Sequence, residues 1–256
     1  MNLGTVIPHL PVGHCQVWWA RPSQARNFHV GLLDGEERDR RAAYRQAVDR
    51  DRFTVGCAVL RTVVGAQQGF AAAAVVIDRS CPDCDRPHGR PVPRGAVDLG
   101  CSVSHSGDHV LVSLARGMRV GVDVEAVDPH VDVDRLVGHV LTAAEAARWR
   151  LLPEPDRLAG FFVYWTRKEA ILKAAGCGLR CAPTEITVSA PDEPPRLLTA
   201  GGSVPLVPGQ VQLHDLTPRE GHVASLASLH PDGRAPLVRE FDAETLLTDH
   251  AGAPAR

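Results

Sequence analysis

Lysine is nearly absent from this chain of 256 residues, in which lysine and arginine together number 28. The two lysines, Lys168 and Lys173, both lie in the short stretch 165–173. Arginine is permanently charged, whereas lysine is a compact ammonium that can release its proton. This placement points to a chemical role for the stretch. The alternative is an ordinary amphipathic helix in which Glu169 and Lys173 form a solvated i,i+4 pair.

Long hydrophobic runs are also missing. The longest apolar run, residues 70–77, is far shorter than the roughly 20 residues that span a bilayer. No basic leader precedes an apolar segment at the N-terminus, where Pro8 and Pro11 interrupt the chain. The formal net charge of −2 offers no general attraction for nucleic acid or anionic lipid. We therefore expect a cytoplasmic protein with no nucleic-acid or membrane partner.

Cysteine usage argues against a secreted disulfide framework, because the 7 cysteines are odd in number and irregularly spaced. Cys81 and Cys84, with His88 nearby, resemble half of a zinc site, but a second cysteine pair is missing. The surrounding prolines predict a loop rather than the helix start of a thioredoxin-like motif. One alternative function is therefore a zinc-loop nucleotide- or carrier-binding protein without catalysis, in which the acidic residues are structural.

Hydrophobic periodicity predicts mixed helices and strands. Residues 36–65 are rich in helix formers, with a break near 49–51 and a closing Gly65. The period then changes to two, and residues 109–114 and 119–125 predict a β-hairpin.

The later part of the chain alternates in the same way. Thr142 and Glu145 form a capping box that opens a helix, and a long helix over 158–175 ends at Gly176. Short strands are predicted at 185–188, 211–213 and 222–229.

A repeated pattern suggests two related halves. Residues 53–61 and 165–173 share the order aromatic, Thr, three residues, Ala, β-branched, Leu, basic. This echo predicts an α+β fold of two similar α/β halves related by a pseudo-twofold axis, with the ligand site at their seam. We expect an N-terminal half over 1–118, a C-terminal half over 119–245 and a flexible tail over 246–256.

Three carboxylates are candidate metal ligands. Asp123 and Glu125 lie one residue apart on a predicted strand, so their side chains share a face while Val122 and Val124 point into the core. Adjacent carboxylates repel unless a cation lies between them, and oxygen ligands suit Mg²⁺ or Mn²⁺. An exposed acidic face is the alternative.

The predicted helix over 158–175 contributes the third carboxylate, Glu169. Glu169 and Lys173 lie on one side of this helix, whereas Lys168 lies on another. The segment 102–106 adds hydroxyls and an imidazole suited to phosphate, with a surface turn as the alternative. A positive patch is expected from Arg38, Arg40, Arg41, Arg45, Arg50 and Arg52. Together these residues predict a magnesium-dependent phosphate-transfer site.

Three motifs carry a specific resemblance. Ser-x-Ser-His-Ser at 102–106, Gly-Val-Asp-Val-Glu at 121–125 and Trp-x-x-Lys-Glu-Ala-x-x-Lys at 165–173 resemble, in order and spacing, the Sfp-type 4′-phosphopantetheinyl transferases. The resemblance covers roughly residues 36–180. It implies a pseudo-twofold α+β monomer that transfers phosphopantetheine from coenzyme A to a serine of an acyl or peptidyl carrier protein. Adenosine 3′,5′-bisphosphate is the other product.

The resemblance also implies roles for individual residues. It makes Asp123, Glu125 and Glu169 the ligands of Mg²⁺, with Mn²⁺ as an alternative, and Glu169 the base as well. Lys173 would neutralise the transferring phosphate and could protonate the leaving group. The residues expected to bind coenzyme A are Ser104, His105, Lys173, Arg52 with Arg40 or Arg45, and Arg86, which stands where such enzymes often have lysine. The carrier protein is expected against residues 126–150 and the start of the long helix. Such enzymes commonly serve secondary-metabolite biosynthesis.

Overall fold

The computed structural model describes residues 6–81, 84, 86, 89–202, 204 and 206–248. The chain divides into two compact units, the first formed by Met1–Gly117 with Leu237–Arg256 and the second by Met118–Pro236. Both units combine helices with mainly antiparallel strands, which confirms the α+β class. Among the described helices, each is too short or too polar to cross a membrane.

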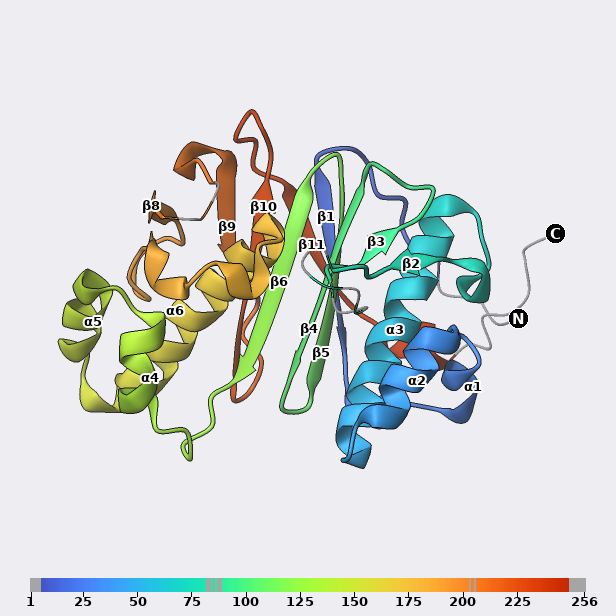
Figure 1. The fold of residues 1–256 in the computed structure, drawn as a ribbon, viewed down its shortest axis with the longest axis horizontal. Coiled ribbons are helices and arrows are strands. Elements are labelled where there is room, and N and C mark those ends of the chain that lie inside the picture. The colour runs from blue at the N-terminus through green and yellow to red at the C-terminus, as the bar shows by residue number, and fades with distance from the viewer. Residues whose placement is uncertain are drawn as a thin grey trace. The chain divides into compact units, whose positions relative to one another are not determined.

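The first unit packs a long helix on a four-stranded sheet of order β11-β1-β5-β4 (Figure 1). The strands are β1 (His14–Ala20), β4 (Leu99–Ser106), β5 (His109–Arg116) and β11 (Leu237–Asp242), with the two-residue strands β2 (Ile77–Asp78) and β3 (Val92–Pro93) outside this sheet. The helices are α1 (Asn27–Val30), α2 (Gly35–Ala43), α3 (Ala47–Gln68) and α7 (Glu244–Thr248). Apolar residues of α3 and of the sheet form one buried core.

The second unit packs another long helix on a three-stranded sheet of order β6-β10-β9 (Figure 1). Its strands are β6 (Arg119–Ala126), β7 (Ile186–Val188), β8 (Leu197–Ala200), β9 (Val211–Asp215) and β10 (His222–Leu229). Its helices are α4 (Val133–Val140), α5 (Ala143–Arg150) and α6 (Glu154–Ala175). The core is centred on α6, in which most residues from Gly160 onward are buried.

The two units share a topology. In the first unit, β1 is followed by the 22-residue helix α3 and then by the antiparallel strands β4 and β5. In the second unit, β6 is followed by the 22-residue helix α6 and then by the antiparallel strands β9 and β10. The orders β1-β5-β4 and β6-β10-β9 are equivalent, because the last strand of each set pairs with both others. This likeness supports two similar halves, while the pseudo-twofold axis and a ligand site at the seam stay predictions.

The expected β-hairpin of 109–114 with 119–125 is wrong. β5 pairs with β4 and β1, whereas β6 pairs with β10, so the two strands belong to different sheets. The hairpin partner of β5 is β4, which contains the 102–106 motif. Alternating hydrophobicity identifies a strand but not its partner, and the partner here depends on contacts distant in sequence.

Two expected boundaries in the first unit also differ. The break between the two helices falls at 44–46 rather than at 49–51. α3 continues past Gly65 to Gln68, and Gly69, whose φ is 75°, caps it in the left-handed conformation. A flexible tail was expected from residue 246 onward. Residues 246–248 are instead helical, because α7 extends to Thr248 and buries Leu246 and Leu247. Leu237–Asp242 pairs with β1, so it joins the first unit rather than an expected half ending at 245.

Other expectations are confirmed. Thr142 and Glu145 form the capping box of α5, with Glu145 Oε2 accepting from the Thr142 backbone N–H at 2.7 Å. α6 ends at Gly176 in the left-handed conformation, with a φ of 70°. The three short strands predicted after α6 correspond to β7, β9 and β10.

Candidate active site

Asp123 lies on the face of β6 that packs against α6. Residues 121, 123 and 125 share this face, because side chains alternate along a strand. A Cβ on Gly121 would lie 2.1 Å from the backbone oxygen of Ala170, so glycine allows β6 and α6 to approach closely. Asp123 is consequently 3% exposed, whereas Glu125, nearer the strand end, is half-buried. Val122 and Val124 on the opposite face are buried, as expected.

Lys173 of α6 reaches the carboxylate of Asp123. Its Nζ donates to Asp123 Oδ1 at 2.6 Å and to the backbone oxygen of Val122 at 3.2 Å. The contact joins two of the motifs that the sequence separates by some fifty residues. The second unit therefore brings the expected acid of β6 and the expected lysine of α6 together.

Glu169 lies one helical turn before Lys173 on the same side of α6. Burial raises the pKa of the Glu169 carboxyl, and the negative charge of Asp123 adds to this rise, while Lys173 opposes it. The carboxyls of Asp123 and Glu169 are therefore close enough to repel each other. A divalent cation would relieve this repulsion, and an all-oxygen ligand set suits Mg²⁺ or Mn²⁺. These residues fit such an ion, with Glu125 as a third candidate ligand.

Lys168 has a different environment from Lys173. It is fully buried, and its Nζ donates to Glu145 Oε2 at 2.5 Å and to the backbone oxygens of Val140 and Pro183 at 2.8 and 3.0 Å. These bonds tie α6 to α5, to the end of α4 and to the segment before β7. Its position on another side of the helix was anticipated, but its ionic partner was not.

In the first unit, the structure brings Arg52 and His105 to the tip of the β4–β5 hairpin. Nε and Nη2 of Arg52 both donate to the backbone oxygen of Gly107, and Nη1 pairs with Asp49 at 2.7 Å. His105 is exposed, on the same strand as the buried Ser104. Because successive residues of a strand face opposite sides, Ser104 and His105 do not share a face.

The remaining expected arginines are spread out. The Arg40 guanidinium lies 5.3 Å from the centre of the Phe53 ring, a cation–π contact. Arg45 is exposed in the connection between α2 and α3, and Arg86 is exposed in the cysteine loop. Asp85 and His88 lie outside the described residues, so the zinc site with Cys81 and Cys84 stays a prediction.

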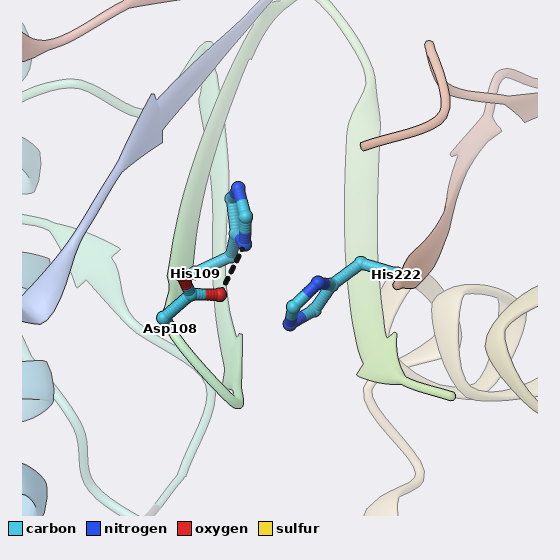
Figure 2. A group of neighbouring side chains, drawn as sticks. All are labelled: Asp108, His109 and His222. Atoms are coloured by element: carbon cyan, nitrogen blue, oxygen red, sulfur yellow. Dashed lines mark hydrogen bonds and ion pairs between the residues drawn. The ribbon is translucent and has the colours of Figure 1, made fainter. Parts of the chain in front are cut away.

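Two polar arrangements in the structure were not predicted from the sequence. In the first unit, His109 is buried and its Nδ1 lies 3.0 Å from Asp108 Oδ1 (Figure 2). Its ring also meets the ring of Trp19 edge-on. Figure 2 also labels His222 of the second unit, whose Nδ1 lies 2.9 Å from the backbone oxygen of Glu220. In the second unit, Arg167 is fully buried and bound to Asp215. No local pattern reveals a buried arginine in so arginine-rich a chain.

Part of the second unit is similar to known proteins. Residues 119–227 match the model of the 4′-phosphopantetheinyl transferase superfamily. The matched segment contains Asp123, Glu125, Glu169 and Lys173.

Individual relatives carry the same name. The chain is 33% identical over 155 residues to 4′-phosphopantetheinyl transferase HetI of Nostoc sp., a match of 59% of this chain and 62% of HetI. It is 34% identical over 88 residues to 4′-phosphopantetheinyl transferase AcpT of Salmonella typhimurium, covering 34% of this chain and 46% of AcpT. It is 29% identical over 173 residues to a phosphopantetheinyl transferase of Thraustochytrium sp., covering 63% of this chain and 58% of that protein. The chain thus spans less than two thirds of the length of each of these relatives.

Proposed function

We propose that this protein transfers the 4′-phosphopantetheine group of coenzyme A to a serine hydroxyl of an acyl or peptidyl carrier protein. The serine oxygen forms a bond to the phosphorus that carries pantetheine, and the phosphoanhydride bond of coenzyme A breaks. The serine proton passes to the enzyme, and adenosine 3′,5′-bisphosphate leaves. The meeting of Asp123, Glu169 and Lys173 within the segment that matches the superfamily is the observation that carries this proposal.

Glu169 is the proposed base. Burial, together with the negative charge of Asp123, raises the pKa of the Glu169 carboxyl in the metal-free protein, so its carboxylate is more basic there than that of an exposed glutamate. Its carboxylate would accept the proton of the serine hydroxyl, directly or through a water molecule.

Asp123, Glu125 and Glu169 are the residues that would hold Mg²⁺ or Mn²⁺. Such an ion, when bound, neutralises charge on the pyrophosphate of coenzyme A. The contact between Lys173 and Asp123 places the ammonium of Lys173 beside these acids. We propose that Lys173 binds the transferring phosphate there and supplies a proton to the leaving group.

Residues of the first unit are proposed to bind the nucleotide part of coenzyme A. Arg52 and the exposed His105 converge on one hairpin tip, which supports a shared role in binding phosphate. The proposal extends, on the resemblance alone, to Ser104, Arg40, Arg45 and Arg86. Docking of the carrier against 126–150, membership of the Sfp type, a monomeric state and a cytoplasmic location also stay predictions.

The proposal is tested by incubating the purified protein with coenzyme A, Mg²⁺ and an apo carrier protein. Mass spectrometry of the intact carrier should then show the added mass of one phosphopantetheine group. The control omits Mg²⁺ and adds EDTA, which should abolish the added mass. An unmodified carrier across acyl and peptidyl carriers, with the protein shown to be folded, would contradict the proposal.

A further inference from the structure

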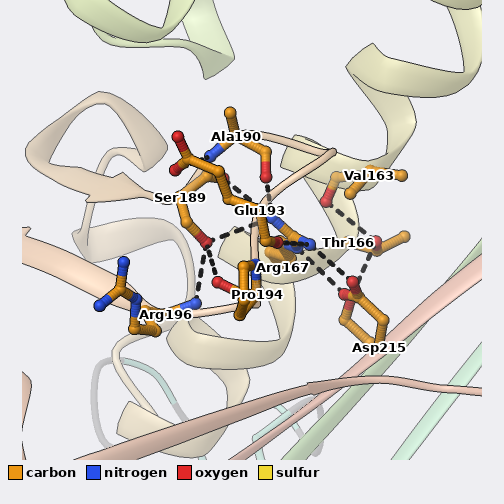
Figure 3. Close-up of polar contacts among 10 residues, drawn as sticks. Val163, Thr166, Arg167, Ser189, Ala190, Glu193, Pro194, Arg196 and Asp215 are labelled. Carbon is orange, nitrogen blue, oxygen red and sulfur yellow. Dashed lines mark hydrogen bonds and ion pairs between the residues drawn. The ribbon is translucent and has the colours of Figure 1, made fainter.

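Arg167 is a fully buried arginine of α6 that forms two hydrogen bonds to the carboxylate of Asp215 on β9. Its Nε donates to Asp215 Oδ1 at 3.0 Å, and its Nη2 donates to Asp215 Oδ2 at 2.6 Å (Figure 3). A two-bond arginine–carboxylate contact fixes the orientation of both groups as well as their separation. It therefore fixes where α6 lies along β9.

The other donors of Arg167 bind the chain that follows β7. Nη1 donates to the backbone oxygens of Ser189 and Ala190 at 2.9 and 2.8 Å, and Nη2 to that of Glu193 at 3.2 Å (Figure 3). The guanidinium is thus surrounded by acceptors, which compensates for its burial.

Ser225 of β10 connects this contact to Asp123. Ser225 is paired with Asp123 on β6 and with Asp215 on β9, so the three side chains form a row on the face beneath α6. Ser225 Oγ donates to Asp215 Oδ1 at 3.2 Å and lies 3.1 Å from Oγ1 of Thr166, the residue before Arg167.

α6 is therefore bound at both ends of the row formed by Asp123, Ser225 and Asp215. Lys173 binds Asp123 at one end, and Arg167 binds Asp215 at the other. Glu169 lies between Arg167 and Lys173 along the helix. We propose that Arg167 and Asp215 are a positioning pair, which sets the rotation of α6 and so holds Glu169 at the correct distance from Asp123 to share a divalent cation.

This inference rests on the proposed function, and it adds a pair that does not itself touch substrate. Residues that orient a metal ligand without touching the metal typically contribute about 10- to 100-fold to metal affinity or activity. Loss of the pair should therefore alter cation affinity and turnover, rather than stability alone.

The test compares Asp215→Asn with Asp98→Asn. Asp98 forms a 2.6 Å ion pair with Arg116 in the first unit, and its side chain is 46% exposed against 40% for Asp215, so it is a matched control. Mn²⁺ affinity of the protein alone is measured by electron paramagnetic resonance, and turnover and KM are measured with saturating coenzyme A. Asp215→Asn should weaken Mn²⁺ binding and lower turnover by about 10-fold or more, with KM for the carrier unchanged. Asp98→Asn should change neither.

Asp215→Glu keeps the charge and should recover part of the Mn²⁺ affinity and of the turnover. It also serves as the second variant if Asp215→Asn does not fold. Unchanged Mn²⁺ affinity in folded Asp215→Asn or Asp215→Glu would overturn the positioning role, even if the melting temperature falls. If the wild-type protein binds Mn²⁺ but modifies no carrier, the proposed function fails while the Mn²⁺ comparison still decides the positioning role.

Discussion

Lys168 of α6 and Glu145 of α5 form a buried ion pair, with 2.5 Å between Nζ and Oε2. Glu145 is the third residue of α5, and its other carboxylate oxygen accepts from the backbone N–H of Val188 at 2.8 Å. Burial lowers the pKa of Lys168, and the Glu145 carboxylate opposes that shift. The pair therefore joins α5, α6 and β7 through one fully enclosed contact.

The first unit contains an equivalent ion pair. Arg61 of α3 is fully buried and donates through Nε to Glu37 Oε2 at 2.8 Å, and Glu37 is the third residue of α2. Counted from the first residues of their 22-residue helices, Arg61 and Lys168 occupy the same position. The sequence echo instead aligned Arg61 with Lys173, so it matched the two long helices in a different register.

The first prediction is that Lys168→Met destabilises the protein. Removing the ammonium leaves the Glu145 carboxylate buried without its cation, which should lower the free energy of unfolding by about 3–5 kcal/mol. Urea unfolding followed by circular dichroism measures this change. Arg135→Met is the control, because Arg135 and Asp132 are 86% and 57% exposed, and a surface pair contributes about 1 kcal/mol or less.

The double variant Lys168→Met with Glu145→Gln separates lost charge from lost packing. It should be more stable than Lys168→Met alone, since no carboxylate then remains buried. A double variant that is less stable than Lys168→Met would show that packing, rather than the ion pair, dominates at this position.

The second prediction concerns Glu169 and pH in the metal-free protein. A carboxyl whose folded pKa is raised stabilises the fold when protonated, and this stabilisation is lost as the pH rises through its folded pKa. Glutamine does not ionise, so Glu169→Gln avoids the loss of stability that ionisation of Glu169 causes. In EDTA at pH 7 the variant should therefore be more stable than the wild type, and the difference should shrink towards pH 4.

Thermal unfolding of both proteins across pH in EDTA measures the Glu169 effect. A Glu169→Gln variant that is less stable than wild type at pH 7, or a difference independent of pH, would contradict a raised pKa for Glu169.

The elements that carry the site were more predictable from the sequence than their partners in the fold. Alternation placed Asp123 on a strand, and Gly176 marked the end of α6, because these signals are local. The partner strands of β5 and β6 were missed, since pairing is decided by contacts far apart in sequence. The ionic partner of Arg167 was missed for the same reason, because Asp215 lies on a strand well beyond α6.

The third prediction is that Asp123→Ala abolishes transfer. The carboxylate is a proposed cation ligand and the partner of Lys173, so its loss removes one charged ligand and frees the lysine. Turnover should fall by about 100-fold or more, the usual effect of removing a preorganised charged group. Intact-mass measurement of the carrier gives the rate, with Asp232→Ala, an exposed acid of the same unit, as control. Turnover close to wild type in Asp123→Ala would remove this carboxylate from the mechanism.

The fourth prediction is that His105→Ala discriminates between two donors. The family resemblance makes His105 the residue expected to bind the 3′-phosphate of coenzyme A, and this contact matters only when that phosphate is present. KM for coenzyme A should therefore rise by about 10-fold or more, as for loss of a charge-assisted hydrogen bond, while KM for dephospho-coenzyme A changes little. Equal increases for both donors would assign another role to this exposed histidine.

The fifth prediction is that arginine at the two lysine positions damages the protein in different ways. Lys173→Arg keeps the charge beside Asp123 but replaces a compact, titratable ammonium with a wide and permanently protonated fork. Its turnover should fall by about 10-fold or more at saturating coenzyme A, as for a misplaced catalytic proton donor, with little change in stability.

Lys168→Arg must fit a larger group into a fully buried position, so overpacking should lower its stability by about 1–3 kcal/mol. Its turnover per folded molecule should stay within about threefold of wild type, because Lys168 binds Glu145 and two backbone oxygens rather than the proposed cation ligands. Turnover across pH, together with urea unfolding, distinguishes the two effects. If Lys168→Arg loses more turnover than Lys173→Arg while remaining folded, the roles assigned to the two lysines are reversed.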